Sequence, residues 1–322
     1  MSILTLRDSQ SGSFARIAVN RGFNCFEFKA AVGGRVVDVI DSEPGFETGA
    51  GRPSGNGVPV LFPFPNRIAG GRFKWAGKDY FIPAEVAPYD RTGNAIHGFS
   101  IDVPWRVVEQ TESSATGEFQ LSVDAPNRRS LWPADCIIRL KYTVVGAKLR
   151  TDIEVINPDT QPLPFGFGTH TYFKVPLATG SKPSDCLAFA PVRDCWDLTE
   201  CLPSGRRLPI PEGLDLIGGQ QFGARPLDNG FGVLPADEIV CELRDTAAGL
   251  RVRQATPGHY PELVIYTPPQ RDSICFEPYT CMTDAINLEA QGTPAGWLVL
   301  EPGARFTSWI DIEASEAERL QC

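Results

Sequence analysis

The sequence predicts an all-β fold, and three observations support that prediction. Apolar and polar residues alternate with period two in most patterned runs, as in strands that have one buried face. Glycine and proline, 31 and 28 in number, interrupt these runs often, as turns between short strands require. Helical patterning is scarce. Strands with one buried and one solvated face are typical of antiparallel sheets.

The clearest element is a long hairpin over residues 139–155. Leu140, Tyr142 and Val144 alternate with polar residues before a turn at Gly146. The same alternation continues after the turn, with apolar residues and Thr151 on one side and charged residues on the other. This pattern predicts two antiparallel strands with one solvated face.

Weaker alternation predicts further strands along the chain. They lie at residues 14–19, 23–30, 35–40, 104–110, 118–124, 262–267, 273–277 and 297–303, with another hairpin at 71–83 that turns at Gly77. Only residues 127–135 and 315–320 are candidates for short helices. Residues 182–235, rich in Pro, Gly and Asp, are expected to form a long loop over the sheet.

Composition excludes several classes of protein. A net charge of −9 and a pI near 5.0 argue against a nucleic-acid partner, which would require basic patches. The absence of a long apolar run and of a signal-peptide pattern predicts a cytoplasmic protein that does not enter membranes. Nine scattered cysteines without a CxxC pair predict buried free thiols. We expect a single domain over residues 1–322 because no repeat or linker divides the chain.

Residues 164–175, PFGFGTHTYFKV, read as a strand that carries one of the chain's three histidines. Alternation places Phe165, Phe167 and Phe173 on one face and His170 and Tyr172 on the other. Two glycines share the face of His170, which often marks the close approach of a ligand or another backbone. His170 is therefore a candidate general acid or base.

A glutamate in an apolar strand is the second candidate group. Glu277 follows Ile274, Cys275 and Phe276 and precedes Pro278. A carboxylate there must be hydrogen-bonded, paired or solvated. Glu277 is therefore either a strand-end acid that reaches water or a general base at the mouth of a concave sheet.

Four other polar residues have weaker local support, and a fifth, the remaining histidine, has none. His97 lies before Gly98 in a turn-like setting, and Asn66 and Arg67 lie between a proline and a Gly-Gly turn, where they can donate hydrogen bonds to sugar hydroxyls. Asp228 begins an Asp-Asn-Gly run that predicts a turn. His259, in a Pro/Gly turn, is interpreted as a surface residue.

Motifs of other chemistries are missing. The sequence has no GxSxG, GxxxxGK[ST] or HExxH motif, and GFGTHT lacks the third glycine of a dinucleotide fingerprint. An iron site of His97, His170 and Glu277 is conceivable in a β fold but lacks the usual close spacing of ligands.

Four stretches together resemble the aldose 1-epimerase (mutarotase) family in chain order and spacing. They are FPFPNRIAGGRF (62–73), NAIHGF (94–99), GFGTHTYF (166–173) and CFEPYT (275–280). The resemblance implies a large antiparallel β-sandwich with a concave sugar-binding face and few short helices. Phe99 stands where well-known galactose mutarotases have a glycine, and the GFGTH segment is closer to other branches of the family.

The resemblance also implies roles for these residues. Glu277 would be the general base and His170 the general acid of mutarotation, in which a sugar ring opens and recloses on the other face. His97, Arg67 and Asp228 would bind the sugar, and no metal or cofactor is implied. We also expect Asn66 to bind the sugar. Tyr172, like Trp105 and Phe73, is a candidate stacking surface for the sugar ring.

Two alternatives remain open at this level. A hexose-6-phosphate mutarotase would need converging basic donors, for which Arg67, Arg72 and Arg91 are candidates. A non-catalytic carbohydrate-binding protein of the same fold would keep the aromatic face without using the proton carriers. The expected partner is a small-molecule sugar, and the expected state is a monomer or homodimer.

Overall fold

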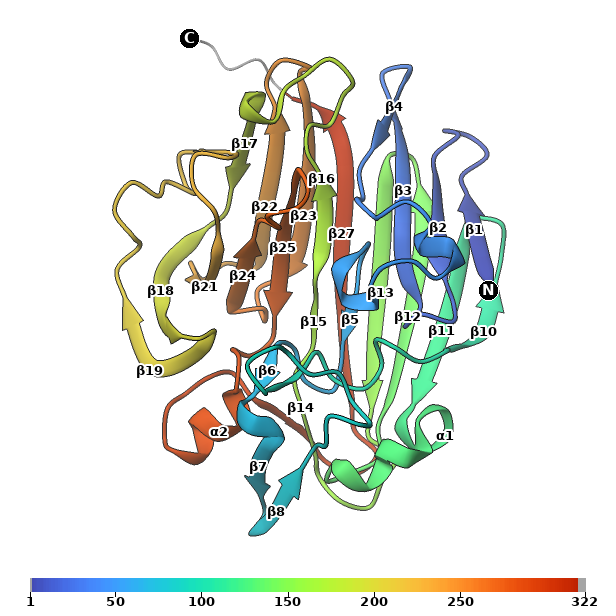
Figure 1. The fold of residues 1–322 in the computed structure, drawn as a ribbon. Helices are drawn as coiled ribbons and strands as arrows, with labels where there is room; N and C mark the ends of the chain where they lie inside the picture. The colour runs from blue at the N-terminus through green and yellow to red at the C-terminus, as the bar shows by residue number, and fades with distance from the viewer. Residues whose placement is uncertain (1, 318–322) are drawn as a thin grey trace.

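The structure, a computed structural model, describes residues 2–317. Its largest element is a nine-stranded antiparallel sheet (Figure 1). The strands, in spatial order, are β10 (Arg106–Gln110), β11 (Ser114–Gln120), β12 (Ile137–Val145), β13 (Lys148–Ile156), β27 (Arg305–Glu316), β23 (Leu250–Pro257), β22 (Glu238–Asp245), β17 (Cys186–Phe189) and β20 (Gln220–Gln221). The predicted long hairpin is confirmed as β12 and β13, with Leu140 opposite Ile153.

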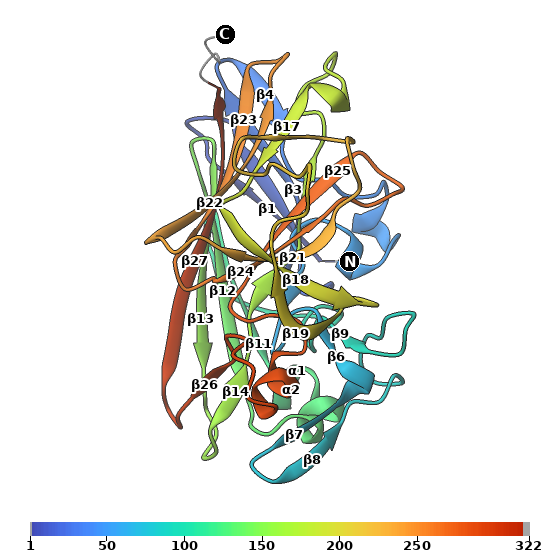
Figure 2. The same cartoon turned by 90° about the vertical axis from the view of Figure 1, so that its left-hand side faces the viewer.

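A second, eight-stranded sheet lies against the first. Its strands are β19 (Leu202–Leu208), β18 (Val192–Thr199), β21 (Asp228–Val233), β24 (Glu262–Tyr266), β25 (Ser273–Tyr279), β15 (Gly168–Thr169) and β5 (Val60–Leu61), with β16 (Thr171–Lys174) also paired to β25. Figure 2 shows the two sheets as two layers. The predicted antiparallel β-sandwich is confirmed.

The core fills the space between the two large sheets. Ile153 and Val155 of β13 join the same buried cluster as Phe276 of β25 and Phe173 of β16. Each such burial contributes about 1.5–3 kcal/mol. Because side chains alternate along β25, the residues between its core positions point to the outer face of the eight-stranded sheet. That outer face carries the candidate site.

Smaller elements surround the two layers. A four-stranded sheet consists of β1 (Ile3–Arg7), β2 (Phe14–Ala18), β3 (Asn24–Val32) and β4 (Arg35–Asp38). Three strand pairs are β6 (Arg67–Ile68) with β9 (Ala95–Ile96), β7 (Arg72–Trp75) with β8 (Lys78–Phe81), and β14 (Leu163–Phe165) with β26 (Leu298–Leu300). The α-helices are α1 (Leu121–Asp124) and α2 (Ala285–Ala290), and 3₁₀ turns span Phe46–Thr48, Pro53–Gly55, Ala69–Gly71, Pro126–Leu131 and Pro183–Asp185.

The prediction of a long loop at residues 182–235 is wrong for much of that segment. Strands β17, β18, β19 and β21 lie in it, and β21 begins at Asp228, where the Asp-Asn-Gly run predicted a turn. Glycine and proline in this segment fall largely between and beside short strands. Cross-strand pairing with β22 and β24 overrides the weak local preference.

Three further predictions need correction. The predicted strand 118–124 ends at Gln120 and continues as the single helical turn α1. Of the predicted helix 127–135, only the part up to Leu131 is helical, as a 3₁₀ turn. The predicted helix 315–320 begins inside strand β27, and residues 318–320 lie outside the described residues.

The remaining strand predictions are confirmed in position. The 71–83 hairpin forms as β7 and β8 around Gly77, whose φ is 79°. All the cysteines in residues 2–317 are free, and all but the half-buried Cys201 are buried. Within the described residues, no helix has the length and apolar character needed to cross a membrane. The single domain stays a prediction.

Candidate active site

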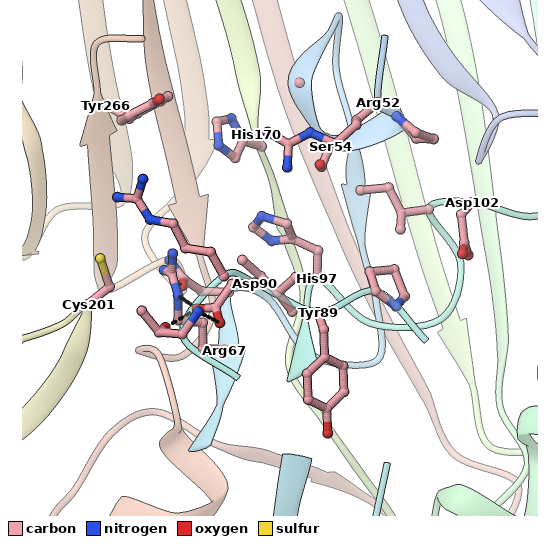
Figure 3. A pocket seen from close by; sticks show the side chains of 18 of the residues that line it. Arg52, Ser54, Arg67, Tyr89, Asp90, His97, Asp102, His170, Cys201 and Tyr266 are labelled. Atoms are coloured by element: carbon pink, nitrogen blue, oxygen red, sulfur yellow. Dashed lines mark hydrogen bonds and ion pairs between the residues drawn. The ribbon is translucent and has the colours of Figure 1, made fainter. Parts of the chain in front are cut away.

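A hollow of about 1340 Å³ opens on the outer face of the eight-stranded sheet. Strands β24 and β25 contribute to its floor together with His170, and residues 52–55, 84–92 and 200–201 line its sides (Figure 3). Ligand pockets of proteins usually measure about 300–1,000 Å³. The hollow therefore has room for a sugar ring together with water or a second group.

His170 and Glu277 meet in this hollow. The Nε2 atom of His170 lies 3.2 Å from Oε1 of Glu277, and the two residues are 8% and 1% exposed. Strand pairing sets this contact, because Thr171 of β16 lies opposite Phe276 of β25. His170 precedes Thr171 and Glu277 follows Phe276. Because the two strands are antiparallel, His170 and Glu277 therefore lie opposite each other. The other carboxylate oxygen of Glu277, Oε2, accepts a hydrogen bond from the hydroxyl of Tyr279.

Burial controls the charge of this pair. It raises the pKa of Glu277 well above the ordinary 4.5 and lowers the pKa of His170 from 6.5 to about 3. Isolated charges are therefore disfavoured on both groups. One proton held by the pair resides either on Glu277 or on His170, and its transfer across the contact leaves the net charge of the pair unchanged. The pair can thus both accept and donate a proton.

The aromatic neighbours of His170 fix its ring. Tyr172 stacks on it with centroids 4.7 Å apart and planes at 10°, and Tyr266 meets it edge-on at 5.9 Å. The hydroxyl of Tyr172 donates to the carbonyl of Ser54 at 3.1 Å. The ring of Tyr172 therefore supports the imidazole of His170, and its hydroxyl is already hydrogen-bonded within the protein.

His97 faces the same space from the strand pair β6 and β9. Its backbone has φ 65°, its N–H donates to the carbonyl of Asn66 at 2.8 Å, and its ring lies 5.7 Å from that of His170. Burial lowers the pKa of His97 well below 6.5, so the imidazole is neutral. Within residues 2–317, the buried Nδ1 atoms of His97 and His170 have no hydrogen-bond partner. Buried polar atoms without partners point to a ligand or water.

Arg67 is held by two neighbours at the edge of the hollow. Its Nε donates to Oδ2 of Asp90 at 2.6 Å, and its Nη1 donates to Oδ1 of Asn66 at 2.7 Å. A guanidinium has five N–H donors, so donors remain for a ligand. Although burial opposes its ionisation, hydrogen bonds from Asn94 and Arg67 hold the pKa of Asp90 below its usual range. Figure 3 shows Arg67 and Asp90 beside His97.

Asp228 lies at the rim of the hollow, at the start of β21. It is exposed and lies opposite Tyr266 of β24, so the two side chains share one face of the sheet. Its Oδ2 is 3.9 Å from Sγ of Cys201, which belongs to the β18–β19 turn. The structure thus brings Asn66, Arg67, His97, Asp228, His170 and Glu277 to one hollow.

The two glycines on the His170 face have a different role from the expected one. A Cβ on Gly168 would collide with the ring of Tyr279, and a Cβ on Gly166 would collide with Cys281. They make room for these side chains rather than for a ligand. The chain also leaves the predicted continuous strand here, passing through β14, β15 and β16 in turn.

Sequence reasoning missed several residues of the site. Asp90 had a usable signal, because it precedes Thr92 and its Oδ1 accepts the Thr92 N–H at 2.9 Å as an Asx turn. Tyr279, two residues after Glu277, follows from alternation along the strand. Tyr266 and Arg52 carried no local signal. Two candidate stacking residues, Trp105 and Phe73, lie in the core instead.

The iron site considered from sequence is not the closest set of ligand atoms. Within the described residues, the donor atoms that lie within 4.8 Å of one another belong to His170, Cys275 and Glu277. His97 is absent from this group. The histidine and the carboxylate of this group are the same pair that meets in the hollow.

Fold and site define a β-sandwich protein with a buried histidine–glutamate pair at the floor of a hollow lined by polar and aromatic groups. The sequence pattern of the family described as aldose 1-epimerase matches residues 35–313. The chain therefore belongs to the aldose 1-epimerase family. Membership supports a mutarotase-like epimerase that acts on carbohydrates, and the recognised resemblance is confirmed.

Several known proteins are similar to this chain in sequence or in fold. The chain is 25% identical over 271 residues to protein LacX, plasmid, of Lactococcus lactis subsp. lactis, covering 80% of this chain and 82% of that protein. A galactose mutarotase-like protein from Clostridium acetobutylicum shares the fold with a TM-score of 0.83 and 22% identity, over 98% of this chain and 99% of that chain. Galactose 1-epimerase from Lactobacillus acidophilus NCFM has a TM-score of 0.72 and 16% identity, over 99% and 100% of the two chains.

Proposed function

We propose that this protein is an aldose 1-epimerase that interconverts the α and β anomers of a free aldose. The observation that carries the proposal is the 3.2 Å contact between Nε2 of His170 and Oε1 of Glu277 at the hollow. The anomeric hydroxyl and the ring oxygen of an aldose are bonded to the same carbon. A base for one and an acid for the other must therefore lie close together.

The reaction needs one proton accepted and one proton donated. Glu277 as carboxylate takes the proton of the anomeric hydroxyl, while His170 as imidazolium protonates the ring oxygen and the C1–O5 bond breaks. The aldehyde rotates about the C1–C2 bond and the ring closes from its other face, with the proton transfers reversed. The protein ends in its starting state. Positioned acids and bases each contribute about 100- to 10,000-fold.

The required protonation state is one proton transfer away from the neutral pair. Burial favours the proton on Glu277, and its move across the 3.2 Å contact gives carboxylate and imidazolium. Polar sugar hydroxyls that enter the hollow favour this ionic form, because they supply the hydrogen bonds that burial removed. Sugar binding therefore favours the protonation state that the reaction requires.

The surrounding residues bind the sugar in this proposal. Arg67, oriented by Asp90, directs its remaining N–H donors to hydroxyl oxygens, and neutral His97 uses its unpartnered Nδ1. Asn66 holds Arg67 and accepts the backbone N–H of His97. Asp228 accepts a hydroxyl at the rim. We assign Tyr172 to the support of His170 rather than to direct binding, since its hydroxyl is bonded to Ser54.

Polarimetry of freshly dissolved α-D-glucose and α-D-galactose tests the proposal. The wild-type protein should accelerate equilibration, and Glu277→Gln and His170→Asn should each reduce kcat by about 100-fold or more. Glu85→Gln is the matched control, because Glu85 lines the same hollow at an exposed position. Sugar binding that is unchanged in Glu277→Gln, without acceleration by either the wild type or the variant, would identify a carbohydrate-binding protein without catalysis.

A specific observation favours hexose phosphates as a second class of substrate. Arg52 and Arg91 line the hollow, and within residues 2–317 neither forms an ion pair. Of the other candidates, Arg67 pairs with Asp90, and Arg72 lies over the ring of Phe81. An anomerisation assay with hexoses and hexose 6-phosphates separates the two classes. A response to phosphorylated sugars alone would replace the free-aldose proposal.

A further inference from the structure

Cys275 is a buried thiol beside the acid–base pair that the proposed reaction does not use. It lies opposite Tyr172 of β16 and Tyr266 of β24, and both tyrosines line the hollow. Directly paired residues of neighbouring strands share one face. Cys275 and Glu277, two positions apart on β25, therefore both project toward the side of the hollow, and Cys275 is completely buried there.

The donor atoms form a compact set. The nitrogen of His170, Sγ of Cys275 and a carboxylate oxygen of Glu277 all lie within 4.8 Å of one another. Around tetrahedral zinc, with bonds of about 2.0–2.3 Å, neighbouring ligand atoms lie about 3.3–3.7 Å apart. The 3.2 Å distance between His170 and Glu277 is close to the lower end of this spacing. A side-chain adjustment of about 1 Å brings the sulfur to the same spacing.

The chemistry of the set selects a thiophilic divalent cation. Imidazole, thiolate and carboxylate suit Zn²⁺, whereas Mg²⁺ prefers a shell of oxygen atoms. Zinc sites with three protein ligands keep a fourth position for water or substrate, and two of the three residues here, His170 and Glu277, line the hollow. His170 also has a buried Nδ1 without a hydrogen-bond partner in the described residues. Metal binding through Nε2 therefore breaks no hydrogen bond of Nδ1.

We propose that His170, Cys275 and Glu277 bind one Zn²⁺ ion, and that the bound ion blocks the acid–base pair. The thiol proton of Cys275 passes to solvent as the zinc–sulfur bond forms, and any proton held between His170 and Glu277 leaves with it. The ion then coordinates both groups that would transfer protons, so the sugar ring cannot be opened. The inhibitory part rests on the proposed function, whereas the binding part does not.

Binding is tested without an activity assay. The chelator-treated full chain is titrated with Co²⁺, whose coordination to a thiolate produces a charge-transfer band in the near ultraviolet. One Co²⁺ per chain is expected, displaced by Zn²⁺ and not by Mg²⁺. Cys275→Ser should remove the band and weaken Zn²⁺ binding by at least about tenfold. Cys201→Ser is the matched control, since Cys201 also lines the hollow and should leave the band intact.

Inhibition is tested by polarimetry. Zn²⁺ should slow sugar equilibration by the wild-type protein, and EDTA should restore the rate. Cys275→Ser should keep the basal rate and need at least about tenfold more Zn²⁺ for the same inhibition. Sugar should in turn weaken Co²⁺ binding by the wild-type protein, because both ligands use His170 and Glu277. This competition requires no variant and covers the case in which Cys275→Ser fails to fold.

The outcomes are separable. No cobalt–thiolate band in the wild-type protein, or a band that persists in Cys275→Ser, overturns the metal site. A band that disappears in Cys275→Ser, together with no acceleration of any sugar by metal-free protein, supports the site and defeats the proposed function. Equal Zn²⁺ inhibition of wild type and Cys275→Ser would assign the inhibition to other residues and overturn the link between the two.

Discussion

The ring of His170 lies parallel to the ring of Tyr172, with centroids 4.7 Å apart. The guanidinium of Arg271 lies over the same tyrosine ring, 5.0 Å from its centroid, and the tyrosine hydroxyl is bonded to Ser54. Because the tyrosine is held at its face and at its hydroxyl, the imidazole that stacks on it is held as well. This arrangement aims Nε2 of His170 at Glu277.

Replacing Tyr172 should separate the role of its ring from that of its hydroxyl. Tyr172→Phe keeps the stacking surface, so kcat should stay within a few-fold of wild type. Tyr172→Ala removes the support of His170 and should reduce kcat by about 100-fold, with a loss of about 3–5 kcal/mol of stability. Steady-state polarimetry and urea unfolding measure both. A larger rise in KM than fall in kcat for Tyr172→Ala would instead assign the ring to sugar binding.

Asp90 should act on substrate binding through Arg67. In Asp90→Asn the guanidinium loses its charged partner at 2.6 Å. Hydrogen bonds to charged groups contribute about 1.5–3 kcal/mol, so KM should rise by about tenfold or more while kcat stays within about threefold. Glu85→Gln serves as the control for a change of charge in the hollow. A fall in kcat at constant KM would contradict this assignment.

The pH profile should be broad. Burial lowers the pKa of His170 from 6.5 to about 3 and raises that of Glu277 above 4.5. The pair therefore takes up a second proton only in acid, and burial keeps its last proton to a higher pH than an ordinary carboxyl would. We expect kcat to be constant from pH 6.5 to about 8. With ordinary pKa values, the pair would lose its proton above pH 6.5, and kcat would fall over this range.

Stability should also change with pH through Glu277. Its pKa is higher in the folded than in the unfolded protein, so its contribution to stability is complete below pH 4.5 and is lost as the pH rises. The free energy of unfolding of wild type, minus that of Glu277→Gln, should therefore fall by about 1.4 kcal/mol per pH unit above that value until the folded pKa is reached.

His170 should show the opposite dependence. Its folded pKa is depressed, so its contribution is complete above pH 6.5 and is lost as the pH falls toward 3. Urea unfolding of wild type, Glu277→Gln and His170→Asn across this range measures both slopes. Slopes of reversed sign would show that the pair is stabilised as an ion pair rather than disfavoured by burial.

Gly168 should tolerate no side chain. In Gly168→Ala the new Cβ collides with the ring of Tyr279, which donates to Glu277. Overpacking costs about 1–3 kcal/mol, and displacement of Tyr279 should also lower kcat. Gly55→Ala is the matched control, because a Cβ there meets no atom within 4 Å. Equal stability of the two variants would show that Tyr279 moves freely.

The sequence determined the local features of this protein. Alternation along 139–155 specified both strands of that hairpin and their buried faces, because the period of side chains along a strand is a local property. The same rule placed His170 and Tyr172 on one face. The motifs that contain Arg67, His97 and Glu277 identified the family before any contact was known.

Only the tertiary structure decided which residues meet. The pairing of Thr171 with Phe276 brings His170 to Glu277 across a long stretch of chain, and no local pattern specifies a register between distant strands. The support by Tyr266, the Asp90–Arg67 pair and the proximity of Cys275 follow from the same assembly. Charge is decided there too, since the pKa values of Glu277 and His170 move in opposite directions only because the fold removes both groups from water.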